Sequence, residues 1–268
     1  MAVSLLAPLA PDPDAPLARF NPVAKITAAV VVLLGLLLTL DPLTPALLLA
    51  AELAVVPLTG VSVRTLTRRC WPLLVGAAGV AVTNLFVVPG GEVLVEIGPF
   101  DITSHAVESA LGVSLRLLAI ALPGVLVLAT TDPMDLADAL VQRWHAPARF
   151  AYGALAALRL LPLLANDWAQ VSRARRARGL DPGRSPVAHL QAFAAQVLAV
   201  LVAAVRRGVR LATAMEARGF GATGVPRTMA REQPLLARDW WLLAGTVLAV
   251  VVATAVSVAV GAWRPPFA

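Results

Sequence analysis

The sequence predicts an all-α integral membrane protein with about five transmembrane helices and a cytoplasmic domain of long amphipathic helices. Of its 268 residues, 59% are hydrophobic and 14% are charged, and the mean hydropathy is +0.79. A soluble domain carries about 25% charged residues. The Leu, Val and Ala runs lack the two-residue alternation of a membrane β-barrel. Basic residues are concentrated, since 15 of the 22 lie between 132 and 239.

The apolar runs divide the chain into a tail, a four-span bundle and a final span. Residues 1–22 are rich in Pro and Asp and lack the basic start of a signal peptide, so we expect a flexible tail. Spanning helices need roughly 20 apolar residues. A last candidate, 240–261, opens with paired tryptophans suited to a membrane interface. Within 23–131 the candidates are 23–40, 43–59, 71–89 and 107–130.

The distribution of Lys and Arg sets the predicted topology. The turn at 41–45 and the loop at 90–106 contain neither residue, whereas the 60–70 loop holds three arginines. Cytoplasmic loops are enriched in basic residues. We therefore expect 132–239 to be cytoplasmic, and 240–268 to hold the fifth span and an external C-terminus.

Two long helical patterns fill the basic region, at 148–178 and 186–218, and Pro162 is expected to kink the first. Each helical pattern ends in the tripeptide Ala-Arg-Gly. If one of the two stretches alone crossed the bilayer, the copies would lie on opposite sides. Both are therefore interpreted as amphipathic helices lying against the cytoplasmic face of the bundle. A protein with six or seven spans is the alternative.

The repeated tripeptides are Ala177-Arg178-Gly179 and Ala217-Arg218-Gly219. One interpretation is helix capping, with a left-handed glycine after the last turn and an arginine that complements the helix dipole. The other is docking, because an arginine beside small residues can enter an acidic groove and bind a carboxylate through two hydrogen bonds. Arg175, Arg207 and Arg210 lie at helical spacing from the motif arginines and form a supporting basic face.

Motifs for catalysis, nucleotide binding and metal binding are missing from the sequence. It contains no G-x-x-x-x-G-K-[ST] and no G-x-S-x-G, and its three histidines lack ligand-like spacing. The rival function is a self-contained secondary transporter or channel, which needs a polar intramembrane path. Arg116 and Glu52 form a candidate intramembrane pair, and the alternative is that each faces a polar cavity or a partner chain.

Four stretches carry a family resemblance: "RFNPVAKI" (19–26), "TTDPMDLADAL" (130–140), "LRLLPLLANDWAQVSRARRARG" (158–179) and "RRGVRLATAMEARGF" (206–220). Over roughly 19–260 the chain resembles the transmembrane T component of energy-coupling factor (ECF) importers of vitamins and metal ions. The proline-rich tail and some extra arginines are less typical.

The resemblance implies a non-catalytic scaffold in the bacterial inner membrane. It implies that Arg178 and Arg218 dock into two ATP-binding-cassette subunits, which hold ATP and Mg²⁺. It also implies a separate small substrate-binding membrane protein, the S component, which sets the transported substrate. We expect this chain to bind no cofactor, metal or nucleic acid of its own.

Overall fold

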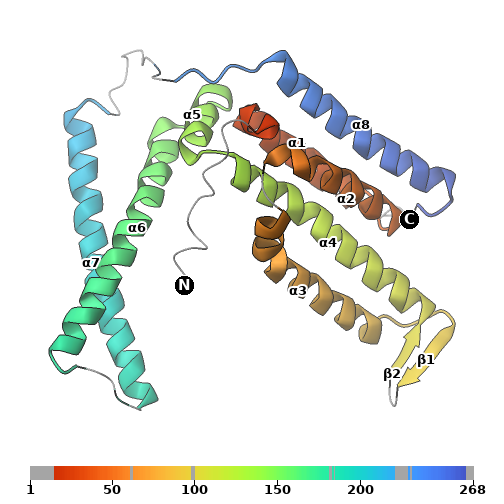
Figure 1. Ribbon diagram of the computed structural model, residues 1–268, viewed down its shortest axis with the longest axis horizontal. Helices are drawn as coiled ribbons and strands as arrows, with labels where there is room; N and C mark the ends of the chain where they lie inside the picture. Colours follow the sequence, from red (N-terminus) through yellow and green to blue (C-terminus); the bar gives the residue numbers. More distant parts are fainter. Residues whose placement is uncertain are drawn as a thin grey trace. The chain divides into compact units, whose positions relative to one another are not determined.

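A computed structural model describes residues 15–60, 63–97, 100–180, 183, 185–220, 229 and 231–263 (Figure 1). Most of the predicted flexible tail, 1–14, lies outside the described residues. Most of the described residues are helical, which confirms the predicted fold class. In chain order the elements are η2 (Pro16–Arg19), α1 (Pro22–Leu37), α2 (Leu43–Val55), η3 (Val56–Thr59), α3 (Val63–Val87), β1 (Val93–Ile97), β2 (Phe100–Thr103), α4 (Ser104–Thr130), α5 (Pro133–Arg143), α6 (Ala148–Ala177), α7 (Pro186–Ala217) and α8 (Ala237–Ala259).

Five described helices are long and apolar enough to cross a membrane: α3 from Cys70 onward, α4, α6, α7 and α8. The predicted number is therefore confirmed by length and composition. Its members differ from the prediction, because α6 and α7 are the helices expected on the membrane surface. The predicted spans 23–40 and 43–59 correspond to α1 and to α2 with η3, which are shorter apolar helices. Charge rather than length distinguishes α6 and α7 from the other three.

The chain divides into two compact units. Helices α1, α2, α3, α4 and α8 belong to the bundle unit, α6 and α7 belong to the hairpin unit, and the boundary falls within α5, between Ala139 and Leu140. The cytoplasmic location of residues 132–239 remains a prediction.

The bundle unit is organised around α4, which packs against α1, α2 and α3, while α8 packs against α1 and α2. Its main core cluster joins Val32, Leu36, Leu48, Ala119 and Ala253. Close approach of α1 and α8 depends on a small residue: a Cβ added at Gly35 would lie 2.5 Å from Cγ1 of Val250. Small residues at helix contacts are typical of membrane bundles, where backbones approach closely.

Two features of the bundle unit differ from the sequence prediction. The segment 90–106, expected as an external loop, contains the antiparallel hairpin β1–β2, in which Val95 pairs with Ile102. The basic loop expected at 60–70 is helical from Val63, so Arg64 and Arg68 belong to the first turns of α3. Arginine is a good helix former, and glycine and proline are absent between Gly60 and Pro72.

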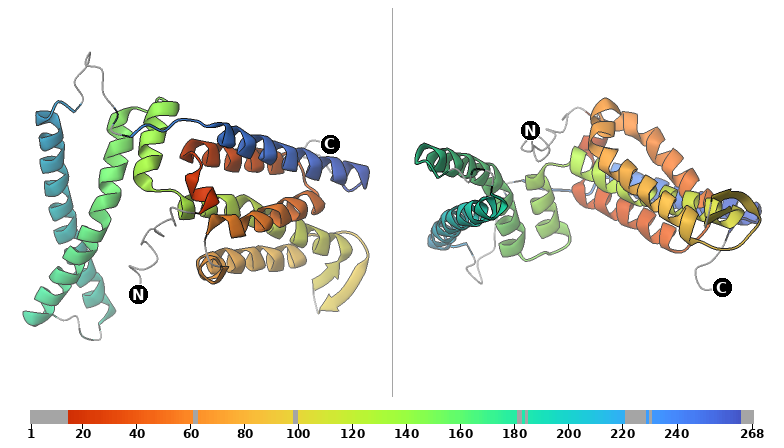
Figure 2. Two further views of the ribbon diagram at one scale, coloured as in Figure 1. Left: turned by 45° about the horizontal axis from the view of Figure 1, so that its top comes forward. Right: turned by 90° about the horizontal axis from the view of Figure 1, so that it is seen from below.

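The hairpin unit consists of α6 and α7, which run in opposite directions and cross (Figures 1 and 2). Both predicted long helices are present with almost the predicted bounds. Helix α6 continues through Pro162 as one element of 30 residues. None of its described residues is buried in the hairpin unit, and in α7 only Gln196 is buried. The unit therefore exposes long apolar faces, such as that of Leu190, Leu198 and Leu201.

Candidate functional site

The first Ala-Arg-Gly motif ends α6 in a Schellman cap. Arg178 is the C-cap residue, and Gly179 takes a left-handed conformation with φ +74°. The Gly179 N–H donates to the Arg176 carbonyl at 3.0 Å, and the Leu180 N–H donates to the Arg175 carbonyl at 3.1 Å. These bonds satisfy two carbonyls that a helix end would otherwise leave unpaired. Glycine is required here because a Cβ disfavours positive φ.

The second motif repeats this geometry at the end of α7. Arg218 is the C-cap residue, and Gly219 has φ +76°. The Gly219 N–H donates to the Glu216 carbonyl at 2.9 Å, and the Phe220 N–H donates to the Met215 carbonyl at 2.9 Å. The capping interpretation of both glycines is thus confirmed. The arginines take no part in these bonds through their side chains.

Both motifs present their arginines to the surroundings of the hairpin unit. All six motif residues, Ala177 to Gly179 and Ala217 to Gly219, are exposed. Within the described part of the chain, neither the Arg178 nor the Arg218 side chain has a hydrogen bond or an ion pair. Because α6 and α7 are antiparallel, the two motifs lie at opposite ends of the crossed hairpin (Figure 2). The two exposed guanidinium groups therefore lie at different ends of the hairpin unit.

An ion pair fixes the crossing of α6 and α7. Arg207 on α7 donates through both terminal nitrogens to the Asp167 carboxylate on α6, with Nη2 to Oδ1 at 3.0 Å. The ring of Trp168 packs edge-on against Phe193 with centroids 5.5 Å apart, and Gln196 Nε2 donates to the Trp168 carbonyl at 2.9 Å. These contacts hold the two motif-bearing helices in one register.

The three residues predicted as a supporting basic face have different environments. Arg210 is exposed, Arg175 is half-buried, and Arg207 is occupied by Asp167. Sequence spacing placed Arg207 on the face of the motif arginine but gave no sign of its partner on the other helix. In this structure the terminal nitrogens of Arg207 join α7 to Asp167 on α6, and its place on a partner-facing basic face stays a prediction.

Arg116 and Glu52 are not joined in the structure. Arg116 Nη2 donates to the backbone carbonyl of Thr39, in the turn between α1 and α2. Asp41 in the same turn accepts hydrogen bonds from the Thr44 backbone and hydroxyl and from Ser257 on α8. Burial opposes the charge on Asp41, but these bonds outweigh burial and lower its pKa. Arg116 thus belongs to a polar cluster that ties α4 and α8 to this turn.

Glu52 lies elsewhere, facing a cavity, and both of its carboxylate oxygens are buried without a hydrogen-bond partner among the described residues. Among those residues, no three His, Cys, Asp or Glu side chains are grouped as metal ligands.

Sequence reasoning missed a polar junction that links the start of α1 to the start of α8. The Asn21 N–H donates to Asp239 Oδ1 at 2.8 Å, and Asn21 Nδ2 donates to the Gln233 and Pro234 carbonyls. Gln233 Nε2 in turn donates to Asp135 on α5 at 3.3 Å. The Asn21-Pro22 pair was the available signal, because it is typical of a helix start, and the Asn21 side chain does cap α1.

Comparisons with known proteins decide the family. The family model CbiQ, described as "Cobalt transport protein", matches residues 14–229. The chain belongs to this CbiQ/EcfT family. It is 32% identical over 189 residues to an "Energy-coupling factor transporter transmembrane protein EcfT" of Exiguobacterium sibiricum, covering 68% of this chain and 72% of the relative. A protein of the same name from Brevibacillus brevis is 28% identical over 255 residues, covering 92% and 93%.

Family membership and the apolar helices together establish a membrane-embedded transport protein of the ECF type. The family match extends through both Ala-Arg-Gly motifs and ends at residue 229. It therefore covers α6 and α7 as well as most of the bundle unit.

Proposed function

We propose that this chain is the T component of an ECF-type importer and transmits ATP-driven motion from two ATP-binding-cassette subunits to a separate substrate-binding membrane protein. The observation that carries this proposal is the pair of identical exposed arginine caps at the two ends of one crossed hairpin. A cap needs the glycine and the backbone N–H groups. It does not need a free guanidinium group, so the arginines are available for docking.

The length of the helices suits two docking partners rather than one. Helix α6 has 30 residues and α7 has 32. At about 1.5 Å per residue, each is roughly 45 Å long. Motifs at opposite ends of such a hairpin can reach two neighbouring subunits. An acidic groove on each ATPase subunit would accept one guanidinium group as a bidentate ligand. ATP and Mg²⁺ would bind to those subunits and not to this chain.

Two covalent connections would carry the motion into the bundle. One is α5, and the other is the segment 231–236 that leads to α8. Gln142 Nε2 near the end of α5 donates to the Arg231 carbonyl at 2.7 Å, and Gln233 bonds to Asp135 on the same helix. Because these hydrogen bonds join the two connections, movement of one would also move the other. The hydrogen bonds of Asn21 to Asp239 and to the Gln233 carbonyl would pass the movement on to the starts of α1 and α8. For ATP to drive this movement, the open and closed states of the ATPase pair must make different contacts with the hairpin unit.

The proposed location is the inner membrane of a bacterium, with the hairpin unit on the cytoplasmic side. The arginine content of α6 and α7 supports this orientation. The exposed apolar faces of the same helices support contact with the bilayer interface or the ATPase subunits. The chain would be a non-catalytic subunit, and the substrate would be chosen by the S component.

A detergent pulldown tests the proposal. The tagged chain is co-expressed with the ATPase and substrate-binding subunits of its host, and co-purification is measured together with uptake. We expect two ATPase subunits per chain with the parent protein and their loss in the Arg178→Ala/Arg218→Ala double variant. Arg173→Ala/Arg206→Ala removes two exposed arginines of α6 and α7 outside the motifs and is the matched control. Full assembly and uptake in the motif double variant would leave capping as the sole role of the motifs.

A self-contained secondary transporter gives a different result. In that case the purified chain alone would accumulate substrate in proteoliposomes without ATPase subunits. ATP-independent uptake by the chain alone would contradict the proposed function.

A further inference from the structure

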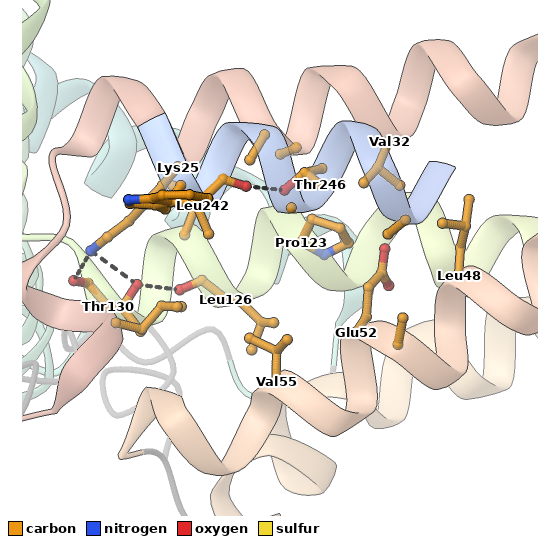
Figure 3. Close-up of a pocket in the computed structure, with 18 residues that line it drawn as sticks. Lys25, Val32, Leu48, Glu52, Val55, Pro123, Leu126, Thr130, Leu242 and Thr246 are labelled. Carbon is orange, nitrogen blue, oxygen red and sulfur yellow. Dashed lines mark hydrogen bonds between the residues drawn. The ribbon is translucent and has the colours of Figure 1, made fainter. Parts of the chain in front are cut away.

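The bundle unit contains a partly open cavity that the proposed coupling function does not use. Its volume is about 390 Å³, and residues of α1, α2, α4 and α8 line it. The walls are mainly apolar, including Val32, Leu48, Pro123 and Leu126 (Figure 3). Cavities of about 300–1,000 Å³ with apolar walls and a few polar groups are typical of small-molecule sites.

Among the described residues that line this cavity, Glu52 is the one with an acidic side chain. Both of its carboxylate oxygens are inaccessible to solvent and have no hydrogen-bond partner among the described residues. Figure 3 shows its carboxylate pointing from α2 into the space beside Pro123. A buried carboxylate without a partner is costly, and acidic side chains inside membrane bundles are usually paired or functional.

The other polar side chains labelled in Figure 3 are satisfied within the chain. Lys25 Nζ donates to the Thr130 carbonyl at 2.9 Å, at the other end of the cavity. The hydroxyls of Thr130 and Thr246 donate to carbonyls one turn earlier in their own helices. None of these groups bonds to Glu52. Glu52 is therefore the labelled side chain whose hydrogen bonds are unmade, and an occupant would meet its buried oxygens once the side chain turns toward the open part of the cavity.

We propose that this cavity binds an amphipathic primary ammonium, with the Glu52 carboxylate as its counter-ion and the apolar walls around its hydrocarbon part. An ammonium group brings three N–H donors and a positive charge, so it satisfies both oxygens and neutralises the buried charge together. A neutral alcohol would supply one donor and leave the charge. The ammonium can belong to a free alkyl amine or to the headgroup of a phosphatidylethanolamine. The proposal is independent of docking by Arg178 and Arg218.

The test uses the full chain in phosphatidylcholine nanodiscs at pH 7 and compares octylamine with octan-1-ol, which has the same hydrocarbon chain. We expect octylamine to raise the unfolding temperature in a saturable way and octan-1-ol to leave it unchanged. Glu52→Gln should abolish the octylamine effect, because it keeps the shape and removes the charge. Glu92→Gln, which removes an exposed carboxylate in the loop before β1, should keep the effect.

A second variant tests the cavity without touching the carboxylate. Gly245 lines the cavity, and a Cβ added there meets no atom within 4 Å, so Gly245→Leu can fill the space without a clash at its base. This variant should also lose the octylamine effect. Equal stabilisation by amine and alcohol, or an undiminished amine effect in Glu52→Gln, would overturn the proposal.

The source of the ammonium is tested by native mass spectrometry of the chain purified from its membrane. Phosphatidylethanolamine retained by the parent protein and lost in Glu52→Gln assigns the site to the lipid. An octylamine response without retained phosphatidylethanolamine assigns it to a free amine. A parent protein that shows neither would contradict the proposal.

Discussion

Replacing Arg218 by alanine separates capping from docking. The Schellman bonds at this helix end come from the Gly219 and Phe220 N–H groups, and the Arg218 side chain is exposed. The substitution therefore removes only the favourable interaction with the helix dipole, about 0.3–1 kcal/mol of stability. Gly219→Val is different, because a β-branched residue must adopt φ +76°. That conformation costs about 1–2 kcal/mol and breaks the cap itself.

Arg218→Ala should weaken binding to the ATPase pair much more than it lowers the stability of the chain. If Arg218 enters an acidic groove, truncation leaves a carboxylate of the partner buried and unpaired, at about 2–5 kcal/mol. At about 1.4 kcal/mol for each tenfold change, the dissociation constant rises about 30-fold to about 4,000-fold. Arg218→Lys should recover only part of the loss, because lysine lacks the bidentate geometry.

The assay measures two quantities for each variant: the affinity of the purified chain for the ATPase pair and its thermal unfolding. Arg206→Ala is the control, since this exposed arginine of α7 lies outside the motif. A large loss of affinity with an almost unchanged unfolding temperature supports docking. Arg218→Ala with parent-like affinity, or Arg218→Lys with full affinity, would refute the reasoning.

Three further outcomes are expected. Arg116→Leu should reduce membrane abundance and uptake more than Arg64→Leu, because Arg116 binds the α1–α2 turn and Arg64 is exposed; equal effects would contradict this. Gly35→Ala should lower the unfolding temperature by crowding Val250, an overpacking cost of about 1–3 kcal/mol, and the added change Val250→Ala should restore it. A cysteine at Ser185, with Cys70 replaced by serine, should resist impermeant thiol reagents in sealed cells; labelling from outside would reverse the topology.

Local features of the motifs could be predicted because they depend on neighbouring residues alone. Gly179 and Gly219 follow long helical patterns, and a left-handed glycine is the usual end of such a helix. The bounds of α6 and α7 were predicted closely for the same reason. The helical start of α3 was missed because basic residues suggested a loop, although arginine favours helix as much as it favours a cytoplasmic location.

Partners of charged residues could not be predicted, because they lie on other helices. Asp167 precedes Arg207 by 40 residues, and their pairing depends on how α6 and α7 cross. Arg116 and Glu52 were a candidate pair because charged groups inside a membrane are usually paired, and the alternative was that each faces a polar cavity or a partner chain. The structure gives Arg116 the Thr39 backbone carbonyl as a hydrogen-bond acceptor and Asp41 as the nearby opposite charge. Glu52 faces a cavity, a feature formed by four helices together.

Site-specific cross-linking tests most directly whether the two motifs anchor different ATPase subunits. Ala177→Cys and Ala217→Cys place exposed thiols beside the motif arginines without removing them, in a chain with Cys70 replaced by serine. In the assembled transporter, each single variant should cross-link to one ATPase subunit, and the double variant should yield one chain carrying two. A double variant that captures only one ATPase subunit, or no cross-link from either position in an assembled and active complex, would contradict the account.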